Sequence, residues 1–364
     1  MDKRILQKAH KFCSLDSLCS NTFLGVCFLL VLFQPYITHA EEKDTPEGGA
    51  AFGQITEFAG DVSVNKKPVR LDMHVFHGDI LITTAGKARI ENHSSHFTVG
   101  PFTHIIFGLP FNTNGGEPYI DLIGGTLRSV IDKFLLEPFE VKTPTVALGV
   151  RGTDFLVHAT HGASVAFTKE GTVSFRADGK TVLMEKMEMT QGGEKIAPLK
   201  PETITAAATL ASLLREVEQF CDLKIPPSLS ARKELNDIIA RWNLNYASYL
   251  VDKKAFGEAK RLCSLAFFIA DLKTLRAEAM LNKGMISFTF MGEETTALKD
   301  LEVIIEDFGH TPSAEQALYF KGLIYYRQKD VKKAKEALEA YMKKYPDGKF
   351  RENVLSILNL LSGE

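Results

Sequence analysis

The sequence has few of the patterns that mark an enzyme or a nucleic-acid-binding protein. Lysine and arginine total 43 against 45 aspartates and glutamates, for a formal net charge of -2. The basic excess of a non-specific nucleic-acid binder is therefore missing. The chain contains no Gly-x-Ser-x-Gly elbow, no phosphate-binding glycine loop and no His-Glu-x-x-His zinc motif. We expect a protein that is not an enzyme, needs no cofactor and does not bind nucleic acid.

Long apolar runs are also scarce, and the clearest one lies near the N-terminus. Residues 23–33 form it, with four basic residues before it and Thr38-His39-Ala40 after it. The run is shorter than the roughly 20 residues that a membrane span needs. The pattern predicts a signal peptide over 1–40 that is cleaved after Ala40. We expect a periplasmic or otherwise exported protein that is not an integral membrane protein once processed; an uncleaved anchor is the alternative.

Cysteine is scarce as well, because three of the five cysteines precede the predicted cleavage site. Cys221 and Cys263 remain in the mature chain. In an oxidising compartment two thiols can form one disulfide. The alternative is two separate thiols buried in helices, and the sequence leaves both open.

From residue 52 to 197 the chain consists of short alternating apolar runs separated by turn residues. Such a pattern is typical of a sandwich, a barrel or a β-solenoid. The densest stretch is 139–157, where proline, which lacks a ladder donor, and glycine, which admits positive φ, interrupt the alternation. We expect its corner residues to be structural, with the arginine bracing the turn and a nearby acid such as Asp154. These corner residues are Thr143, Pro144, Arg151, Gly152 and Thr153.

The order of these runs resembles the FecR domain. The matching runs are Gly60-Asp-Val62, Gly78-Asp-Ile-Leu-Ile-Thr83, Phe97-Thr-Val-Gly-Pro101, Leu122-Ile-Gly-Gly-Thr-Leu127, Phe139 to Pro144, Val150-Arg-Gly-Thr-Asp-Phe155 and Glu170-Gly-Thr-Val173. The resemblance covers about residues 52 to 195 and implies an exported, all-β, solenoid-like or β-helix-like domain. The best-known members carry a cytoplasmic anti-sigma region, whereas only residues 1–22 precede the apolar run here. Iron-siderophore signalling to a sigma factor is therefore not implied.

Histidine is the strongest candidate for chemistry, because six histidines of the β region form His-x-x-His pairs. The pairs are His74/His77, His93/His96 and His158/His161. Imidazole is a common transition-metal ligand. In a strand, however, positions i and i+3 face opposite sides, so a pair converges only across a turn. We favour polar residues at solvent-facing corners and expect no metal, with these six histidines as the candidates otherwise.

Beyond Pro201 a period of 3.6 residues replaces the alternation, so we expect helices. The predicted order is a tether at 41–51, the β domain at 52–197, a linker at 198–202, connecting helices at 203–239, repeats at about 240–273, 277–310 and 315–348, and a capping helix at 349–364.

Small and aromatic residues at fixed offsets in the last two repeats resemble the tetratricopeptide repeat. The residues that carry this resemblance are Gly284, Ala297, Gly322, Tyr325, Ala334 and Pro346. Small residues at the contact let two antiparallel helices approach closely, and three stacked repeats begin to bury a continuous core. The resemblance implies a protein partner held by the helical repeats.

Two interaction modules in series, with no catalytic constellation, predict a non-enzymatic exported cell-envelope adaptor or scaffold. The β domain would bind an envelope component, and the groove of the repeats would bind a protein. Two alternatives stay open. One is a periplasmic sensor or regulator in a FecR-like signalling chain. The other is a metal- or small-ligand-binding protein that uses the β-domain histidines.

Overall fold

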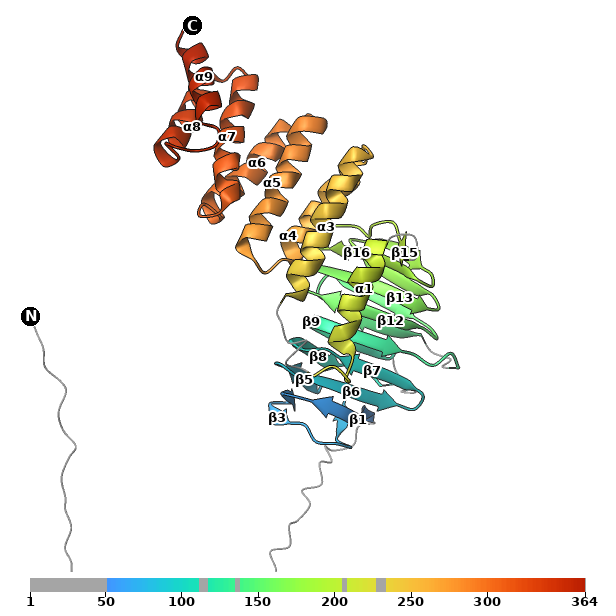
Figure 1. The fold of residues 1–364 in the computed structure, drawn as a ribbon. Helices are drawn as coiled ribbons and strands as arrows, with labels where there is room; N and C mark the ends of the chain where they lie inside the picture. The colour runs from blue at the N-terminus through green and yellow to red at the C-terminus, as the bar shows by residue number, and fades with distance from the viewer. Residues whose placement is uncertain (1–50, 111–116, 135–137, 205–207, 227–233, 364) are drawn as a thin grey trace, which may run out of the picture. The chain divides into compact units, whose positions relative to one another are not determined.

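The computed structural model describes residues 51–110, 117–134, 138–204, 208–226 and 234–363 (Figure 1). Strands make up the first part of this chain and helices the last part. The predicted class, an all-β module followed by a helical repeat array, is confirmed. The predicted signal peptide and the tether up to residue 50 lie outside the described residues, and Ala51 already belongs to the first strand.

The described strands form two sheets that share strand β9. Sheet A contains, in spatial order, β4 (His74–Phe76), β1 (Ala51–Ala59), β6 (Lys87–Asn92), β7 (Ser95–Val99), β9 (Tyr119–Val130), β12 (Asp154–Ala159), β13 (Ala163–Glu170), β16 (Glu188–Gly193) and β17 (Glu202–Thr203). Sheet B contains β3 (Lys67–Pro68), β2 (Val62–Val64), β5 (Ile80–Thr83), β8 (Thr103–Phe107), β9, β10 (Phe139–Lys142), β11 (Val146–Val150), β14 (Val173–Ala177) and β15 (Lys180–Met184).

The chain changes between the two sheets repeatedly as it advances from β1 to β17. The strands of each sheet therefore follow one another nearly in chain order. The pairing of β9 with β10 is parallel, whereas the other pairings among the described strands are antiparallel. The module therefore departs from the parallel coils of a regular β-helix.

Strand β9 passes from one sheet to the other at Gly124-Gly125. Residues 120–124 pair with β8 in sheet B, and residues 125–130 pair with β12 in sheet A. Gly125 has a φ of +100°, a backbone conformation that residues with a Cβ rarely adopt. A Cβ on Gly125 would lie 2.3 Å from Thr103 Oγ1. Glycine is therefore required at this corner.

The core of the β module lies between the two sheets and centres on phenylalanine rings. Phe52 packs against Phe97 and Phe107 with ring centroids 5.6 and 5.0 Å apart, and Phe97 packs against Phe139 at 5.3 Å. All four are fully buried. Tilted aromatic pairs at these distances add to the stability that their buried area provides.

The two sheets differ in what covers their outer faces. Strands β12, β13 and β16 of sheet A are buried along nearly their whole length, which means that both of their faces are covered. Helix α1 (Ala208–Cys221) lies across sheet A in Figure 1. Strand β5 of sheet B instead alternates exposed and buried residues, as a half-buried strand does.

The remaining described helices form three helical hairpins and a final helix. They are α3 (Leu235–Asp252) with α4 (Phe256–Ile269), α5 (Lys273–Phe290) with α6 (Glu294–Asp307), α7 (Pro312–Arg327) with α8 (Val331–Lys344), and α9 (Arg351–Ser362). Each hairpin begins a few residues before the corresponding predicted repeat, because the repeat signature marks helix contacts and not helix starts. None of the helices in the described part of the chain is both long and apolar enough to cross a lipid bilayer.

Residues 198–202 belong to the β module, although they were predicted as a linker. The Leu199 amide donates to the Gln191 carbonyl at 3.0 Å, and the short strand β17 pairs with β16. Leu199 and Ile204 are buried. Proline and lysine in this stretch suggested a loop, but the apolar residues between them add it to sheet A.

We predict that Gly125→Ala lowers the free energy of unfolding by about 2–4 kcal/mol. The alanine would have a strained positive φ, and its Cβ would clash with the backbone and side chain of Thr103. The matched control is Gly124→Ala, whose Cβ would meet its nearest atom at 3.8 Å. The control should change stability by less than about 1 kcal/mol. Urea denaturation of the two variants measures both values. Equal losses would contradict the assigned corner.

Candidate functional site

The β module and the helical half share one apolar cluster on the outer face of sheet A. Leu156, Val165 and Phe167 from the sheet join Val217 of α1 and Ile239 of α3 in this cluster, and all five are fully buried. Burial of each such side chain stabilises the fold by roughly 1.5–3 kcal/mol. The helices therefore complete the β module, instead of following it as a separate unit.

A buried lysine fixes the end of α1 to sheet A. Lys87 of β6 is fully buried, and its Nζ donates to the carbonyls of Gln219 at 2.8 Å and Asp222 at 2.7 Å. These carbonyls lie at the C-terminal end of α1, where the helix leaves acceptors unpaired and where a cation is favoured. Burial lowers the pKa of Lys87, while nearby Asp222 opposes that shift.

Two side-chain amides fix α3 to strand β16. Gln191 Nε2 donates to Asn243 Oδ1 at 2.7 Å, and Asn243 Nδ2 donates to Gln191 Oε1 at 3.0 Å. Both residues are buried. Because each amide satisfies the other, the pair sets the position of α3 without leaving these polar groups unpaired.

His158 of β12 belongs to a hydrogen-bonded chain that runs from the β module into α3. Asn236 Nδ2 donates to Asp271 Oδ2 at 3.0 Å, and this contact fixes the orientation of the amide. His158 Nε2 therefore donates to Asn236 Oδ1 at 2.6 Å, and Nδ1 accepts from Thr126 Oγ1 at 2.9 Å. Burial lowers the pKa of His158 to about 4, against an opposing effect of Asn236. The imidazole is neutral at neutral pH.

A pocket of about 1000 Å³ opens beside this chain of hydrogen bonds, and we call it the junction pocket. Its walls come from β9, the β12–β13 turn, the end of α1, the start of α3 and the α4–α5 turn. The lining residues that matter below are Phe102, His104, Ile123, His158, Phe220, Glu234, Leu235, Asp237, Asp271 and Leu272. A mostly apolar cleft with a few polar groups at the junction of two structural units is the usual form of a binding site.

The first of the predicted histidine pairs, His74/His77, lies at the surface at the end of a strand. His74 is an exposed residue of β4, beside Phe76. His77 is also exposed and lies beyond the end of β4, in the turn that leads through Gly78 to β5. The turn that the sequence suggested at this point is therefore present, but His74 and His77 do not form part of a metal-ligand cluster with any other described residue.

The second and third pairs are divided among three places in the structure. His93 lies in the β6–β7 turn with a φ of +51°. His96 lines a cleft with Arg89 and Arg128, and burial together with these two cations lowers its pKa. His158 and His161 both line the junction pocket, which also contains His104.

A metal site built from these histidines does not form among the residues that the structure describes. No three His, Cys, Asp or Glu side chains of these residues are placed to hold a metal ion. The physical reason is that the three pairs lie at separate corners of the β module, so ligands from different pairs do not meet. The junction pocket was not predicted as such, although His158 and His161 were among the candidates.

The corner at Gly152 has the expected conformation, but Arg151 does not make the expected contact with Asp154. Gly152 has a φ of +61°, and a Cβ there would lie 2.8 Å from Lys133 Cα. Asp154 is held by Arg128 of β9, whose Nε and Nη2 donate to its two carboxylate oxygens at 3.0 and 2.8 Å. Arg151 is exposed. The expectation that Arg151 braces Asp154 is wrong, because both carboxylate oxygens of Asp154 accept from Arg128, on the strand paired with β12.

The turn at Thr143-Pro144 depends on the threonine hydroxyl. Thr143 Oγ1 accepts from the Val146 amide at 2.9 Å and lies 2.9 Å from Ser164 Oγ. The hydroxyl thus closes the β10–β11 turn on its own backbone, as threonine does in short turns. Thr153, at the other corner, is buried.

Cys221 and Cys263 are both free and buried, so the disulfide alternative is not the arrangement of this structure. They lie on α1 and α4. Burial raises the pKa of each thiol to about 12. Thiols of this kind are largely protonated and poor nucleophiles at neutral pH.

Four of the six predicted repeat-packing residues lie at the contacts within the helical hairpins. A Cβ on Gly322 would lie 2.5 Å from Leu338 Cδ2, whereas a Cβ on Gly284 would meet its nearest atom at 3.4 Å. Ala297 and Ala334 are fully buried. Glycine is therefore needed more strictly in the last repeat than in the middle one. Of the other two predicted residues, the Tyr325 ring lies under Lys333, and Pro346 is exposed after α8.

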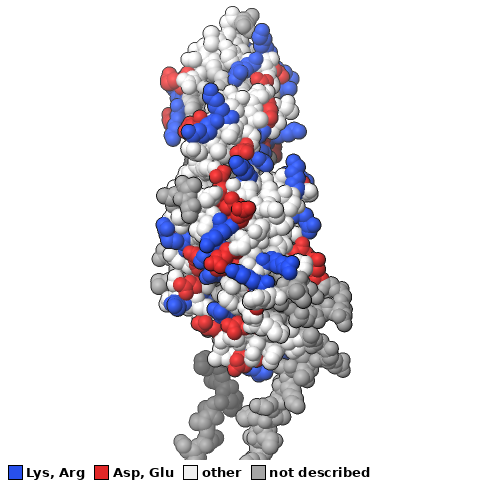
Figure 2. Space-filling model, turned by 90° about the vertical axis from the view of Figure 1, so that its right-hand side faces the viewer, with Lys and Arg blue, Asp and Glu red and all other residues white. Residues whose placement is uncertain are grey.

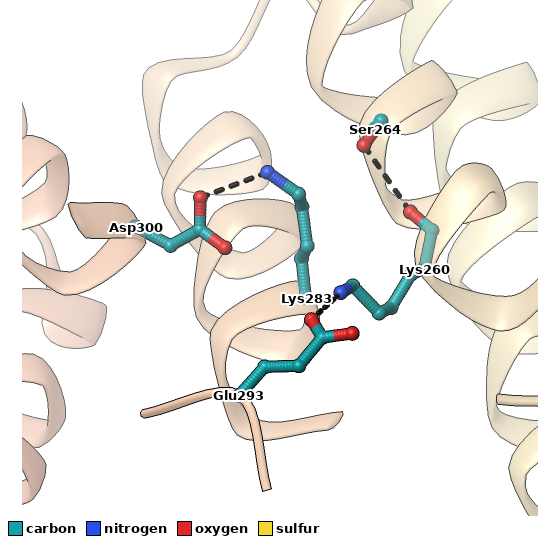
Figure 3. A network of polar contacts seen from close by, with 5 residues as sticks. All are labelled: Lys260, Ser264, Lys283, Glu293 and Asp300. Carbon is teal, nitrogen blue, oxygen red and sulfur yellow. Dashed lines mark hydrogen bonds and ion pairs between the residues drawn. The ribbon is translucent and has the colours of Figure 1, made fainter. Parts of the chain in front are cut away.

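One ion pair joins the first helical hairpin to the second, and another lies within the second hairpin (Figure 3). Lys260 of α4 contacts Glu293, just before α6, while Lys283 of α5 donates to Asp300 of α6 at 2.8 Å. The Asp300 side chain is only 8% exposed, and burial raises its pKa although Lys283 opposes the shift. The Lys260 contact fixes the stacking of the two hairpins, and the Lys283 contact fixes α5 against α6. Removal of Lys283 would leave a poorly hydrated charge on Asp300.

Two exposed apolar surfaces remain that alternation alone did not single out. On sheet B, Ile80, Ile82 and Ile123 are 37–40% exposed, and we call them the isoleucine face. The signal for it was the consecutive run Ile80-Leu81-Ile82, which places apolar side chains on both faces of a strand.

Figure 2 shows lysines, arginines and acids interspersed on the face in view, without a broad basic area there.

The second surface lies at the turn ends of the first two helical hairpins, and we call it the aromatic edge. Phe290 and Met291 are exposed, and the Phe290 ring stacks on Phe256 with centroids 4.8 Å apart and planes 7° apart. Phe256 and Met291 line a depression of about 510 Å³ together with Lys254 and Arg261. Exposed aromatic residues beside arginine are typical of protein-binding surfaces.

We predict that acid weakens the fold through His158. Its folded pKa of about 4 lies below the unfolded value of 6.5, so only the unfolded state gains a proton as the pH falls between these values. The stabilising contribution is complete above pH 6.5 and is lost as the pH falls toward 4, by up to about 3 kcal/mol.

Urea denaturation of His158→Gln at several pH values measures this effect. The variant should be less stable at neutral pH and should lack the part of the acid loss that His158 causes. The control is His161→Gln, the same substitution at an exposed position, and its acid loss is measured beside that of His158→Gln. An unchanged slope in His158→Gln would contradict a neutral buried imidazole.

Comparison with known proteins agrees with both sequence resemblances. Residues 78–174 match the family model described as FecR protein, and residues 316–348 match that of a tetratricopeptide repeat. No curated protein matches the chain in sequence.

Two crystal structures of a candidate anti-sigma factor from Parabacteroides distasonis resemble part of the chain, each with 12% identity and a TM-score of 0.30. The similarity covers 34% of this chain and 57% of that protein, so this chain spans little more than half of its length. The chain carries a FecR domain at residues 78–174 and a tetratricopeptide repeat at residues 316–348.

Proposed function

We propose that the protein is a non-enzymatic adaptor of the cell envelope. The observation that carries the proposal is the apolar cluster that the FecR-containing β module shares with α1, α3 and α4. Through this cluster, a partner on the repeats and a component on the β module are held by one folded unit. An adaptor needs its two binding surfaces held together by one folded unit. Two independent binding modules joined by a flexible linker would not need such a shared core.

The helical repeats supply the protein-binding side. A tetratricopeptide repeat is an interaction module, and the aromatic edge provides large apolar groups at its surface. Aromatic side chains carry much of the binding energy at protein interfaces, because they bury a large area at low entropic cost. A protein partner on this edge is the simplest use of these residues.

The β module supplies the other side. Its sheet A is covered by helices, whereas the isoleucine face of sheet B is exposed. Isolated apolar residues on a surface need no explanation, but neighbouring ones on one sheet face favour contact with another molecule. Ile80 pairs directly with Ile106 on the adjacent strand, which extends the apolar area.

An exported location agrees with the FecR domain and with the predicted signal peptide, which lies outside the described residues. A second candidate function, a sensor or regulator in a FecR-like signalling chain, is favoured by the same family match. It differs from the adaptor in requiring that ligand binding on one side changes partner binding on the other.

A photo-crosslinking amino acid at Phe290 and, separately, at Ile82 tests the adaptor in the protein's native cells. We expect protein adducts at Phe290 and a different set of adducts at Ile82. Phe290→Asp should reduce capture of the Phe290-side partner about 30-fold, because loss of a central aromatic contact costs about 2 kcal/mol or more. Full-length protein is used, since cutting the chain between the modules would expose the shared cluster.

The control position is Asp178, an exposed residue of the β14–β15 hairpin that lies on neither surface. If neither Phe290 nor Ile82 gives adducts above the level at Asp178, the adaptor proposal fails. Adducts at both positions that depend on a small molecule would favour the sensor.

A further inference from the structure

We propose that the junction pocket binds a cationic residue of the component that the β module holds: an extended peptide segment with a lysine or arginine between apolar side chains. This inference rests on the proposed function, because the segment is taken to belong to the component that binds the isoleucine face. Three properties of the pocket carry it, namely its charge, its unpaired polar atoms and its continuity with the isoleucine face.

The charge of the pocket is negative. Glu234, Asp237 and Asp271 contribute carboxylates, and none of the described residues that line the pocket is lysine or arginine. The N-termini of α3 and α5 lie at the pocket and each adds about half a positive charge, while the C-terminus of α4 adds about half a negative one. Helix dipoles therefore do not neutralise the three carboxylates, and the described lining residues keep a net charge of roughly minus two to minus three.

Each carboxylate of the α3–α5 wall keeps one oxygen for a ligand. Asp237 Oδ1 accepts from the amides of Asp271 and Leu272 at 2.9 and 3.0 Å, and Asp271 Oδ2 accepts from Asn236. These bonds position the two side chains. The second oxygen of each has no hydrogen-bond donor among the described residues, so an ammonium or guanidinium group finds fixed acceptors there.

The opposite wall contains an enclosed polar atom without a partner. His104 lines the pocket from β8, and its Nε2 is buried with no hydrogen bond to any described residue. A buried polar atom of this kind costs about 1–3 kcal/mol unless something pairs with it. A carbonyl or amide group of a bound peptide backbone would supply the missing partner.

The apolar part of the lining favours a peptide over a small free amine. Phe102, Phe220 and Leu235 form the interior, and Leu272, 56% exposed, stands at the rim. Ile123 belongs both to the pocket and to the isoleucine face. A segment with apolar residues beside the cation can therefore continue out of the pocket onto sheet B, as a small amine cannot. A metal ion is not the fitting occupant, since the described residues offer no ligand cluster.

Fluorescence anisotropy with purified mature protein tests the site. The probes are a dye-labelled Gly-Leu-Lys-Leu-Gly peptide and its Gly-Leu-Glu-Leu-Gly counterpart. We expect the lysine peptide to bind at least tenfold more tightly. The double variant Glu234→Gln/Asp271→Asn should weaken lysine-peptide binding tenfold or more, because both amides keep their shape and lose their charge. Leu272→Ser should weaken both peptides.

The matched control is Glu306→Gln/Asp307→Asn. These residues are a second pair of exposed carboxylates at the end of α6, and neither of them lines the pocket. It should bind the lysine peptide as the wild type does. Equal affinity for the two peptides, no binding of the lysine peptide, or wild-type affinity of the pocket variant would each overturn the proposal. Displacement of the peptide by hexylamine at the peptide's own affinity would also overturn it, in favour of a small amine.

The test is independent of the crosslinking at Phe290. Adducts at Phe290 together with failure of the lysine peptide would leave the adaptor standing and remove this site. Binding of the lysine peptide without adducts at either surface would remove the adaptor and leave a peptide-binding pocket.

Discussion

The structure depends on the burial of the outer face of sheet A. Strands β12 and β13 carry apolar residues on both faces, so they cannot be left open to water on one side. Helices α1, α3 and α4 provide the cover, and Lys87, Gln191 and His158 supply the polar contacts that position it. The same burial creates the junction pocket, because the covering helices end beside the corner of β9 and leave a gap there.

Sheet B has the opposite character, and this asymmetry gives the molecule its exposed surfaces. The described helices do not cover the outer face of sheet B, and this face carries the isoleucine face. Gly125 allows one strand to serve both sheets, so covered and uncovered faces belong to a single continuous β structure. The aromatic edge lies farther along the chain, on the first two hairpins, and is joined to the sheets through α3 and α4.

Much of the fold was predictable from sequence, because its signals are local. Alternating runs predicted the strands, Gly152 a corner and Gly322 a close helix contact. The contacts between the modules were not predictable, since they join residues distant in the chain: Lys87 with Gln219, Gln191 with Asn243, and Arg128 with Asp154 in place of the expected Arg151. The pocket was hidden for the same reason. His158 and His161 were noted only as a spaced pair, and the carboxylates opposite them come from the α3 and α5 termini.

Differential scanning calorimetry of the mature protein tests the central claim, that the β module and the repeats next to it form one cooperative unit. A shared core predicts a single main transition for the β module with α1, α3 and α4. The backbone amides of β13 and of α4 should lose their protection from hydrogen exchange together. Two separate transitions, with β13 still protected after α4 has unfolded, would contradict the account.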